Sequence, residues 1–71
     1  MVMSNSLFYN NTKRLSDEIF RKITNCKLPY FYMSEINRYV NLGAITCTKI
    51  TGTRYLIESN IDGRSIEINL K

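Results

Sequence analysis

Apolar and polar side chains alternate along the last part of the chain, around two pairs of turn-forming residues. Gly52-Thr53 suits a type II′ hairpin and Asp62-Gly63 suits a type I′ hairpin. Counting outwards from both turns gives one apolar face of three strands, made of Ile50, Tyr55, Ile57, Ile66, Ile68 and Leu70. The polar face carries Lys49, Arg54, Glu58, Ser65, Glu67 and Asn69. The pattern therefore predicts a three-stranded antiparallel meander within residues 43–70, with one covered side.

The same count predicts which residues lie opposite each other in the sheet. Ile50 is expected opposite Tyr55 in the first hairpin, and Ile57 opposite Ile68 in the second. Both pairs place apolar side chains on the side that needs a cover. The residues before Gly43 are the part of the chain that can supply it.

A first helix is predicted in the segment before Pro29. Its apolar positions recur at four-residue spacing at Leu15, Ile19 and Ile23. Thr12 and Asp17 are alternative starting points, and Pro29 disfavours a helical residue before it. Before this helix, Leu7-Phe8-Tyr9 is either a short edge strand or a packed arm.

A second helix is predicted from Ser34, a good N-cap, to the C-terminal stop at Gly43. Its apolar side consists of Ile36, Tyr39 and Val40. Its free side consists of Ser34, Asn37, Arg38 and Asn41. Between the two helices, the aromatic run Tyr30-Phe31-Tyr32 either fills the gap between helix and sheet or forms an exposed platform.

These elements predict a single α+β domain over residues 1–71. Two short helices pack on a three-stranded antiparallel meander in a winged-helix-like arrangement, and a short N-terminal strand is an open alternative. A hydrophobic content of 44% suffices for one small core and argues against disorder. No apolar run is long enough to span a bilayer, so a cytoplasmic location without membrane contact is expected.

The residue types offer little for catalysis or metal binding. The chain has no His, and its two Cys, Cys26 and Cys47, are expected to be half-buried reduced thiols. Glu58 and Glu67 are predicted directly opposite each other, where two carboxylates could share a proton or hold a metal. The alternative is a solvated surface pair relieved by neighbouring cations. We expect no enzyme, no metal and no cofactor.

The charge pattern points to an acidic partner. The net charge is +4 and the isoelectric point is about 9.3, which favours duplex DNA or an acidic protein surface. Asn37, Arg38 and Asn41 have side chains that read adenine and guanine edges. Lys49 and Arg54 flank the first hairpin tip and could hold phosphates. Lys13 and Arg14 are expected to matter less.

The stretch from Glu35 to Gly43, then Ile45, then Lys49 to Ile57, resembles the recognition helix and wing of small excisionase-type winged-helix proteins. That family is similar to the DNA-binding part of MerR-type regulators. The resemblance implies a recognition helix at Ser34–Leu42 and a wing at Ile45–Ile57. The DNA-contacting positions that it implies are Asn37, Arg38, Asn41, Lys49 and Arg54.

Two hypotheses of function follow. The first is a small DNA-binding protein, either a transcription regulator or a recombination accessory factor, from a phage or mobile element. The second is a small non-enzymatic inhibitor of the anti-defence or anti-CRISPR type, which binds a host or defence protein. Its partner-binding residues would be Tyr30, Phe31 and Tyr32, because aromatic side chains are typical interface anchors.

Overall fold

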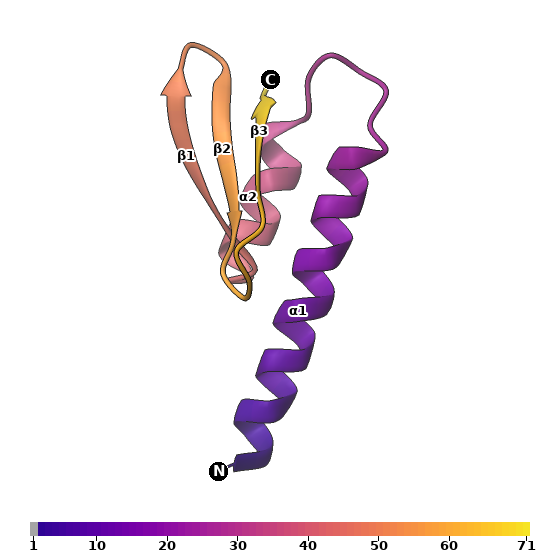
Figure 1. Ribbon diagram of the computed structural model, residues 1–71, viewed down its shortest axis with the longest axis vertical. Coiled ribbons are helices and arrows are strands. Elements are labelled where there is room, and N and C mark those ends of the chain that lie inside the picture. Colours follow the sequence, from indigo (N-terminus) through magenta and orange to yellow (C-terminus); the bar gives the residue numbers. More distant parts are fainter. Residues whose placement is uncertain (1) are drawn as a thin grey trace.

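The computed structural model describes the backbone of residues 2–71 and the side chains of residues 11–71. Its elements are α1 (Val2–Thr24), α2 (Met33–Asn41), β1 (Ile45–Thr51), β2 (Arg54–Ser59) and β3 (Ser65–Asn69) (Figure 1). The three strands form an antiparallel meander in the order β1-β2-β3. The predicted α+β class is therefore confirmed. Neither helix in the described part of the chain carries an apolar stretch sufficient to cross a bilayer.

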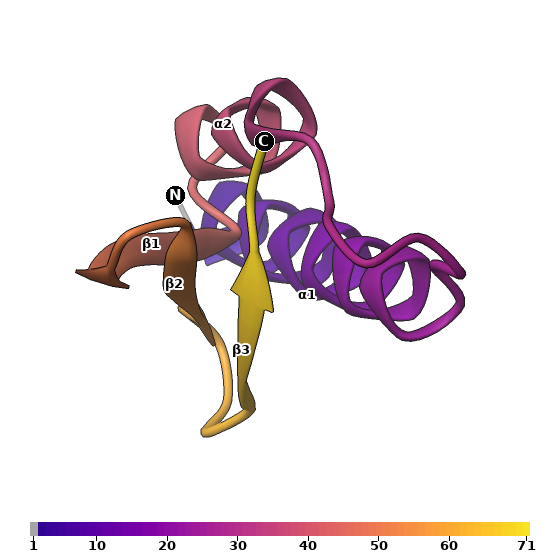
Figure 2. The ribbon, with the colours of Figure 1, turned by 90° about the horizontal axis from the view of Figure 1, so that it is seen from above.

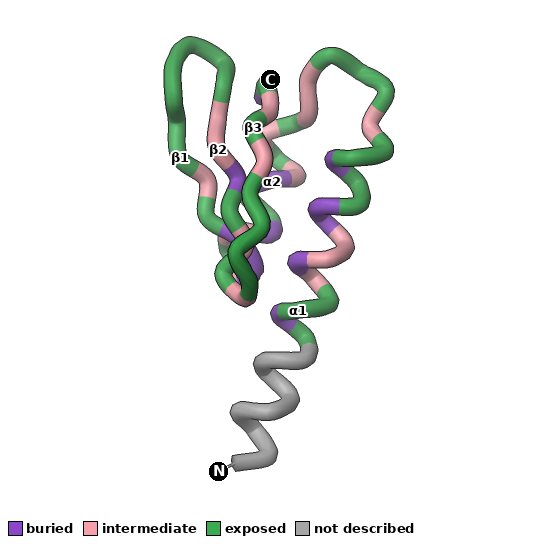
Figure 3. Tube along the Cα trace, in the orientation of Figure 1, coloured by how far each residue is buried: buried purple, intermediate pink, exposed green. Residues whose placement is uncertain are grey.

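Both helices lie on one side of the twisted sheet (Figure 2). One core joins the two layers, made of Ile19, Phe20, Ile23, Ile36, Tyr39, Ala44, Ile45, Ile57 and Leu70. Buried positions on α1 face the sheet and α2 (Figure 3). Tyr55, Ile66 and Ile68 are half-buried and pack against this core, which confirms most of the predicted apolar face. Ile50 is the exception, with 47% of its surface exposed.

The predicted register of the first hairpin is wrong by one residue. Lys49, not Ile50, is the partner of Tyr55, and the pairing is irregular between Lys49 and Thr51. A bulge of this kind leaves one residue unpaired, and here that residue is Ile50. The predicted Gly52-Thr53 loop is correct, since Thr51 pairs with Arg54 and Gly52 has φ 55°.

The second hairpin differs from its prediction in both register and turn. Ile57 lies opposite Ile66 instead of Ile68, a shift of two that keeps every side chain on its predicted face. Gly63 lacks the positive φ that a type I′ turn requires. The connection is a wider loop closed by a hydrogen bond from the Ser59 N–H to the Arg64 carbonyl, at 3.0 Å.

Side chains hold this wider loop in shape. The Ser59 hydroxyl accepts hydrogen bonds from the backbone N–H groups of Ile61 and Asp62, at 3.2 and 3.4 Å. The Asp62 carboxylate in turn accepts the Arg64 N–H at 3.1 Å. Local bonds of this type compete with a tight turn, which explains why Asp62-Gly63 is not a two-residue hairpin.

Helix α1 begins much earlier than the sequence pattern predicted. Both predicted starts, at Thr12 and at Asp17, lie inside it. Leu7-Phe8-Tyr9 belongs to α1 and is neither a strand nor an arm, while its side chains lie outside the described residues. Thr12 and Ser16 are buried, because they lie on the same face as Ile19 and Ile23.

Helix α2 starts one residue before the predicted N-cap and stops as predicted. Tyr32, not Ser34, is its N-cap. At the other end Gly43 has φ 81°, and its N–H donates to the Val40 carbonyl at 3.0 Å. The Ala44 N–H donates to the Tyr39 carbonyl at 3.1 Å, which completes a Schellman motif and leads directly into β1.

A parallel backbone pairing lies at the C-terminal end of β3. The Phe31 N–H donates to the Asn69 carbonyl at 2.7 Å, and the Lys71 N–H donates to the Phe31 carbonyl at 2.9 Å. The Met33 N–H donates to the Lys71 carbonyl at 3.1 Å. We call this pairing, between residues 31–33 and residues 69–71, the clasp. It fixes the connection between the helices against the end of the sheet.

Candidate nucleic-acid interface

The outer face of α2 is the best exposed of the predicted contact surfaces. Ser34, Asn37, Arg38 and Asn41 are all exposed, as predicted. The opposite side of the helix is fixed in the core by Ile36 and Tyr39, which are 0% and 1% exposed. Arg38 makes no ion pair with another described side chain. The four polar side chains therefore form a stripe that faces solvent.

The two predicted wing cations lie on β1 and β2, near the tip of the first hairpin. Arg54 lies opposite Asn69 on the face of the sheet that the helices leave uncovered, and its guanidinium is 3.3 Å from the Glu67 carboxylate. Lys49 lies opposite Tyr55, which reverses its predicted face, and it is exposed near the hairpin tip. That tip is about 20 Å from the Gly43 turn, given the rise per residue of a strand. The structure thus separates the wing from the C-terminal end of α2.

Cations of both helices act on one carboxylate of α1. The pKa of Glu18 is held below its ordinary value, first by a hydrogen bond from the Tyr39 hydroxyl and then by the positive charges of Lys22, Arg14 and Arg38. Arg14 of α1 and Arg38 of α2 therefore both lie close enough to Glu18 to act on it. Arg14 is exposed and forms no ion pair with another described side chain.

A polar network around Tyr39 fixes the two helices against each other. The Lys22 ammonium donates to the Tyr39 hydroxyl oxygen at 3.1 Å and to the Glu35 carboxylate at 3.2 Å. These two bonds raise the pKa of Lys22, in that order of effect. The Tyr39 hydroxyl then donates to Glu18. Sequence reasoning missed this network because it assigned Tyr39 only to the apolar side of the helix.

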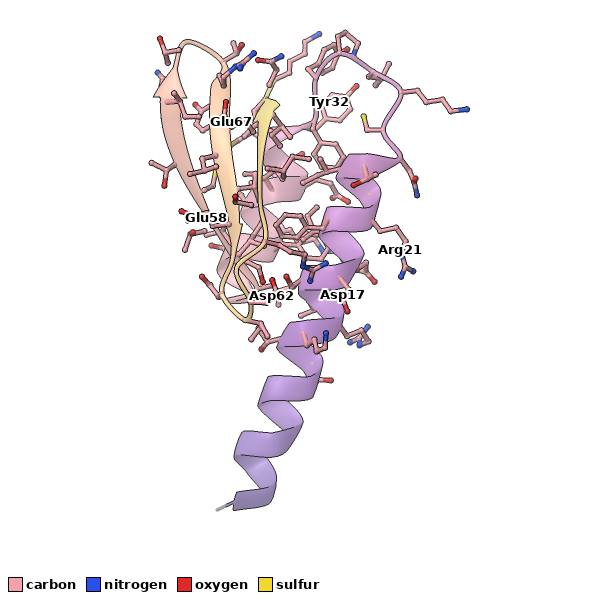
Figure 4. All side chains as sticks on the ribbon, viewed as in Figure 1. Asp17, Arg21, Tyr32, Glu58, Asp62 and Glu67 are labelled. Carbon is pink, nitrogen blue, oxygen red and sulfur yellow. The ribbon has the colours of Figure 1, made fainter. Side chains whose placement is uncertain are left out.

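A second cluster holds the loop between β2 and β3 against α1. The Arg64 guanidinium contacts both carboxylate oxygens of Asp62 at 3.1 Å and lies 5.0 Å from the centre of the Phe20 ring. It also pairs with Asp17, which faces Asp62 in Figure 4. The hydrogen bond from Arg64 lowers the pKa of Asp62. The charge of Arg64 is therefore already matched within the fold.

The aromatic run between the helices is only partly open. Phe31 packs against the core and takes part in the clasp. The Tyr30 ring is half-buried, 5.6 Å from the Tyr32 ring in an edge-on arrangement, and the Lys71 ammonium lies over it. Tyr32 is 49% exposed. Tyr32 is the most exposed of the three predicted anchors.

The structure does not bring Glu58 and Glu67 directly opposite each other. Glu58 lies opposite Ser65 and Glu67 opposite Leu56, so the two carboxylates are not paired, and they lie at different levels of the sheet in Figure 4. Cys26 and Cys47 are free, and burial raises the pKa of the Cys47 thiol. Among the described residues no group of three metal-ligating side chains comes together.

Comparison of the chain with models of protein families, with curated protein sequences and with solved structures found no match.

Proposed function

We propose that the protein is a small DNA-binding protein that contacts duplex DNA through the outer face of α2. The observation that carries this proposal is the exposed stripe of Asn37, Arg38 and Asn41, in which the Arg38 guanidinium forms no ion pair with another described side chain. Arg and Asn make the paired hydrogen bonds that distinguish guanine and adenine in the major groove. Glu35, the carboxylate of α2, forms an ion pair with Lys22 of α1.

Phosphate contacts fit the helices better than the hairpin. Six of the ten cations lie between residues 11 and 42, together with three of the six carboxylates. The charges of Arg14 and Arg38 both act on Glu18, whereas Arg54 is paired with Glu67. Arg14 therefore takes the phosphate-binding role that the sequence pattern gave to Arg54. A role as a transcription regulator or a recombination accessory factor of a phage or mobile element is the finer part of this proposal.

The test is a titration against duplex DNA at two salt concentrations, with a site first selected from random duplexes by the parent protein. Arg38→Ala should weaken binding to the selected site by about 1–3 kcal/mol and change binding to random DNA little. Arg14→Ala should weaken binding to all sequences and lower the salt slope by about one.

Arg54→Ala is the matched control, because it removes the same group from a cation that already has a partner. It should change the salt slope less than Arg14→Ala does. The proposal fails if the parent shows no salt-sensitive binding to duplex DNA. It also fails if Arg38→Ala binds the selected site as tightly as the parent.

A further inference from the structure

A groove runs between α1 and α2 and ends at Phe31 and Tyr32. It has a volume of about 1130 Å³ and is open to solvent. Most of its lining side chains are charged or polar, and the aromatic residues Phe31 and Tyr32 lie at its end. Sites for small ligands usually bury most of the ligand, whereas this groove lies open along the two helices. An open groove between two helices suits a short segment of polypeptide, as in the recognition of an amphipathic helix.

The carboxylates in the wall of this groove are already matched by partners within the fold. Asp17 pairs with Arg64 and also lies 3.8 Å from Lys13. Glu18 accepts the Tyr39 hydroxyl, and Glu35 pairs with Lys22. No negative charge of the wall is left without a positive or hydrogen-bonding neighbour.

Two cations of the same wall remain unmatched. Arg14 and Arg21 are exposed and form no ion pair with another described side chain. Arg21 projects from the side of α1 away from the sheet, and Tyr32 lies beyond the C-terminal end of α1 (Figure 4). The groove thus combines aromatic surface at Phe31 and Tyr32 with two available guanidinium groups.

We propose that this groove binds an acidic amphipathic segment of another protein. Apolar side chains of the segment would contact the groove wall and the Tyr32 ring, while its carboxylates would form paired hydrogen bonds with Arg21 and Arg14. Arg14 is shared with the surface proposed for DNA, whereas Arg21 and Tyr32 are not needed for DNA binding. A DNA-binding protein with this groove could hold a partner protein beside its DNA site.

Two other occupants fit the groove less well. A nucleic-acid backbone could pair with the two guanidinium groups but would leave the apolar surface and the Tyr32 ring uncovered. A second copy of the chain would bring a further net charge of +4 to a surface whose unmatched charge is positive. Both occupants are outcomes of the experiment below.

The experiment measures fluorescence anisotropy of labelled peptides with the full chain. The panel contains amphipathic peptides of about 15 residues with Leu and Phe on one helical face and Glu on the other. Each peptide has a version with Lys in place of Glu, and a scrambled version of the same composition. The acidic amphipathic peptides should bind at least about tenfold more tightly than either comparison set.

Variants then place the contact in the groove. Arg21→Glu and Tyr32→Ala should each weaken binding of the acidic peptides about tenfold. Lys27→Glu is the charge-matched control, and Leu28→Ala is the control for loss of an exposed apolar side chain. Both control residues are exposed and lie outside the groove, so their variants should stay within about twofold of the parent.

Four results would overturn the inference. The first is equal binding of acidic, basic and scrambled peptides. The second is an equal loss in Arg21→Glu and Lys27→Glu, which would mean that only the overall charge acts. The third is loss of duplex DNA binding in Arg21→Glu without any peptide binding, which would assign the groove to nucleic acid. Concentration-dependent self-association that Tyr32→Ala abolishes would instead assign it to a second copy. Failure of the α2 variants to affect DNA binding leaves these readouts unchanged, so the two proposals fail separately.

Discussion

The sheet and the pair of helices differ in how their charged side chains are matched. On the sheet side, Arg54 pairs with Glu67, and Arg64 pairs with Asp62 and Asp17. On the helices, Arg14, Arg21 and Arg38 have no ion-pair partner among the described side chains. A net charge of +4 alone does not show this asymmetry.

This difference shows that an exposed cation indicates an anionic binding partner only where no carboxylate of the fold already pairs with it. An exposed ion pair contributes little to stability but lowers the positive potential that an anion meets. Both layers contribute to the core, whereas the arginines without an ion pair among the described residues all lie on the helices. This difference can be tested at three places.

The largest expected effect comes from the sheet core. Ile57 is 0% exposed, so Ile57→Ala should lower the free energy of unfolding by about 2–5 kcal/mol, measured by urea denaturation. Ile50→Ala removes the same atoms from a side chain that is 47% exposed, and should cost less than about 1 kcal/mol. Equal losses in the two variants would contradict the observed register.

The junction between the two regions should give an intermediate effect. Gly43 has φ 81° and its carbonyl accepts the Asn60 side-chain amide at 3.0 Å, so Gly43→Ala should cost about 1–2 kcal/mol of stability through backbone strain. Gly63 lacks a positive φ and has open space around it, so Gly63→Ala should change stability by less than about 0.5 kcal/mol. Thermal unfolding of both variants compares them directly. A larger loss of stability in Gly63→Ala than in Gly43→Ala would contradict the wider loop and support a tight turn at Gly63.

The smallest expected effect sharpens the charge comparison itself. Glu67→Gln removes the partner of Arg54. It should make the salt slope of binding to random duplex DNA steeper by up to about one. Glu58→Gln makes the same change of charge at an exposed carboxylate without an ion pair among the described residues, and should shift the slope less. If the two variants behave alike, the pairing of Arg54 does not limit its contact with phosphate.

Strand order could be predicted because two short connections join consecutive strands, and the inner faces of β2 and β3 could be predicted because they follow a period of two. The register of the second hairpin is off by two residues, and a shift of two returns Ile57 and Ile66 to the same side. Ile50 was misplaced because a bulge changes the count by one and leaves no distinct mark in the sequence. The start of α1 was misplaced because polar residues such as Asn11 and Thr12 read as a helix cap, yet they lie within the helix.

The candidate site was harder to predict than the fold. The exposed stripe of α2 follows from helical period, so Asn37, Arg38 and Asn41 were correctly placed on a free face. The pairing of Arg54 with Glu67 and the action of Arg38 on Glu18 of α1 depend on the packing of elements distant in sequence. No local pattern encodes such contacts. The groove likewise exists only once both helices and Tyr32 are assembled.

The clasp has a consequence for the order in which the chain folds. Phe31 and Leu70 are far apart in sequence, so bringing them together costs more loop-closure entropy than closing either hairpin. The Schellman motif and the first hairpin are local and can form early. The clasp is then expected to close late, after the sheet has formed. When the protein unfolds, the same pairing is a natural first place to open, and amide hydrogens of Phe31 and Lys71 would then exchange sooner than those of β2.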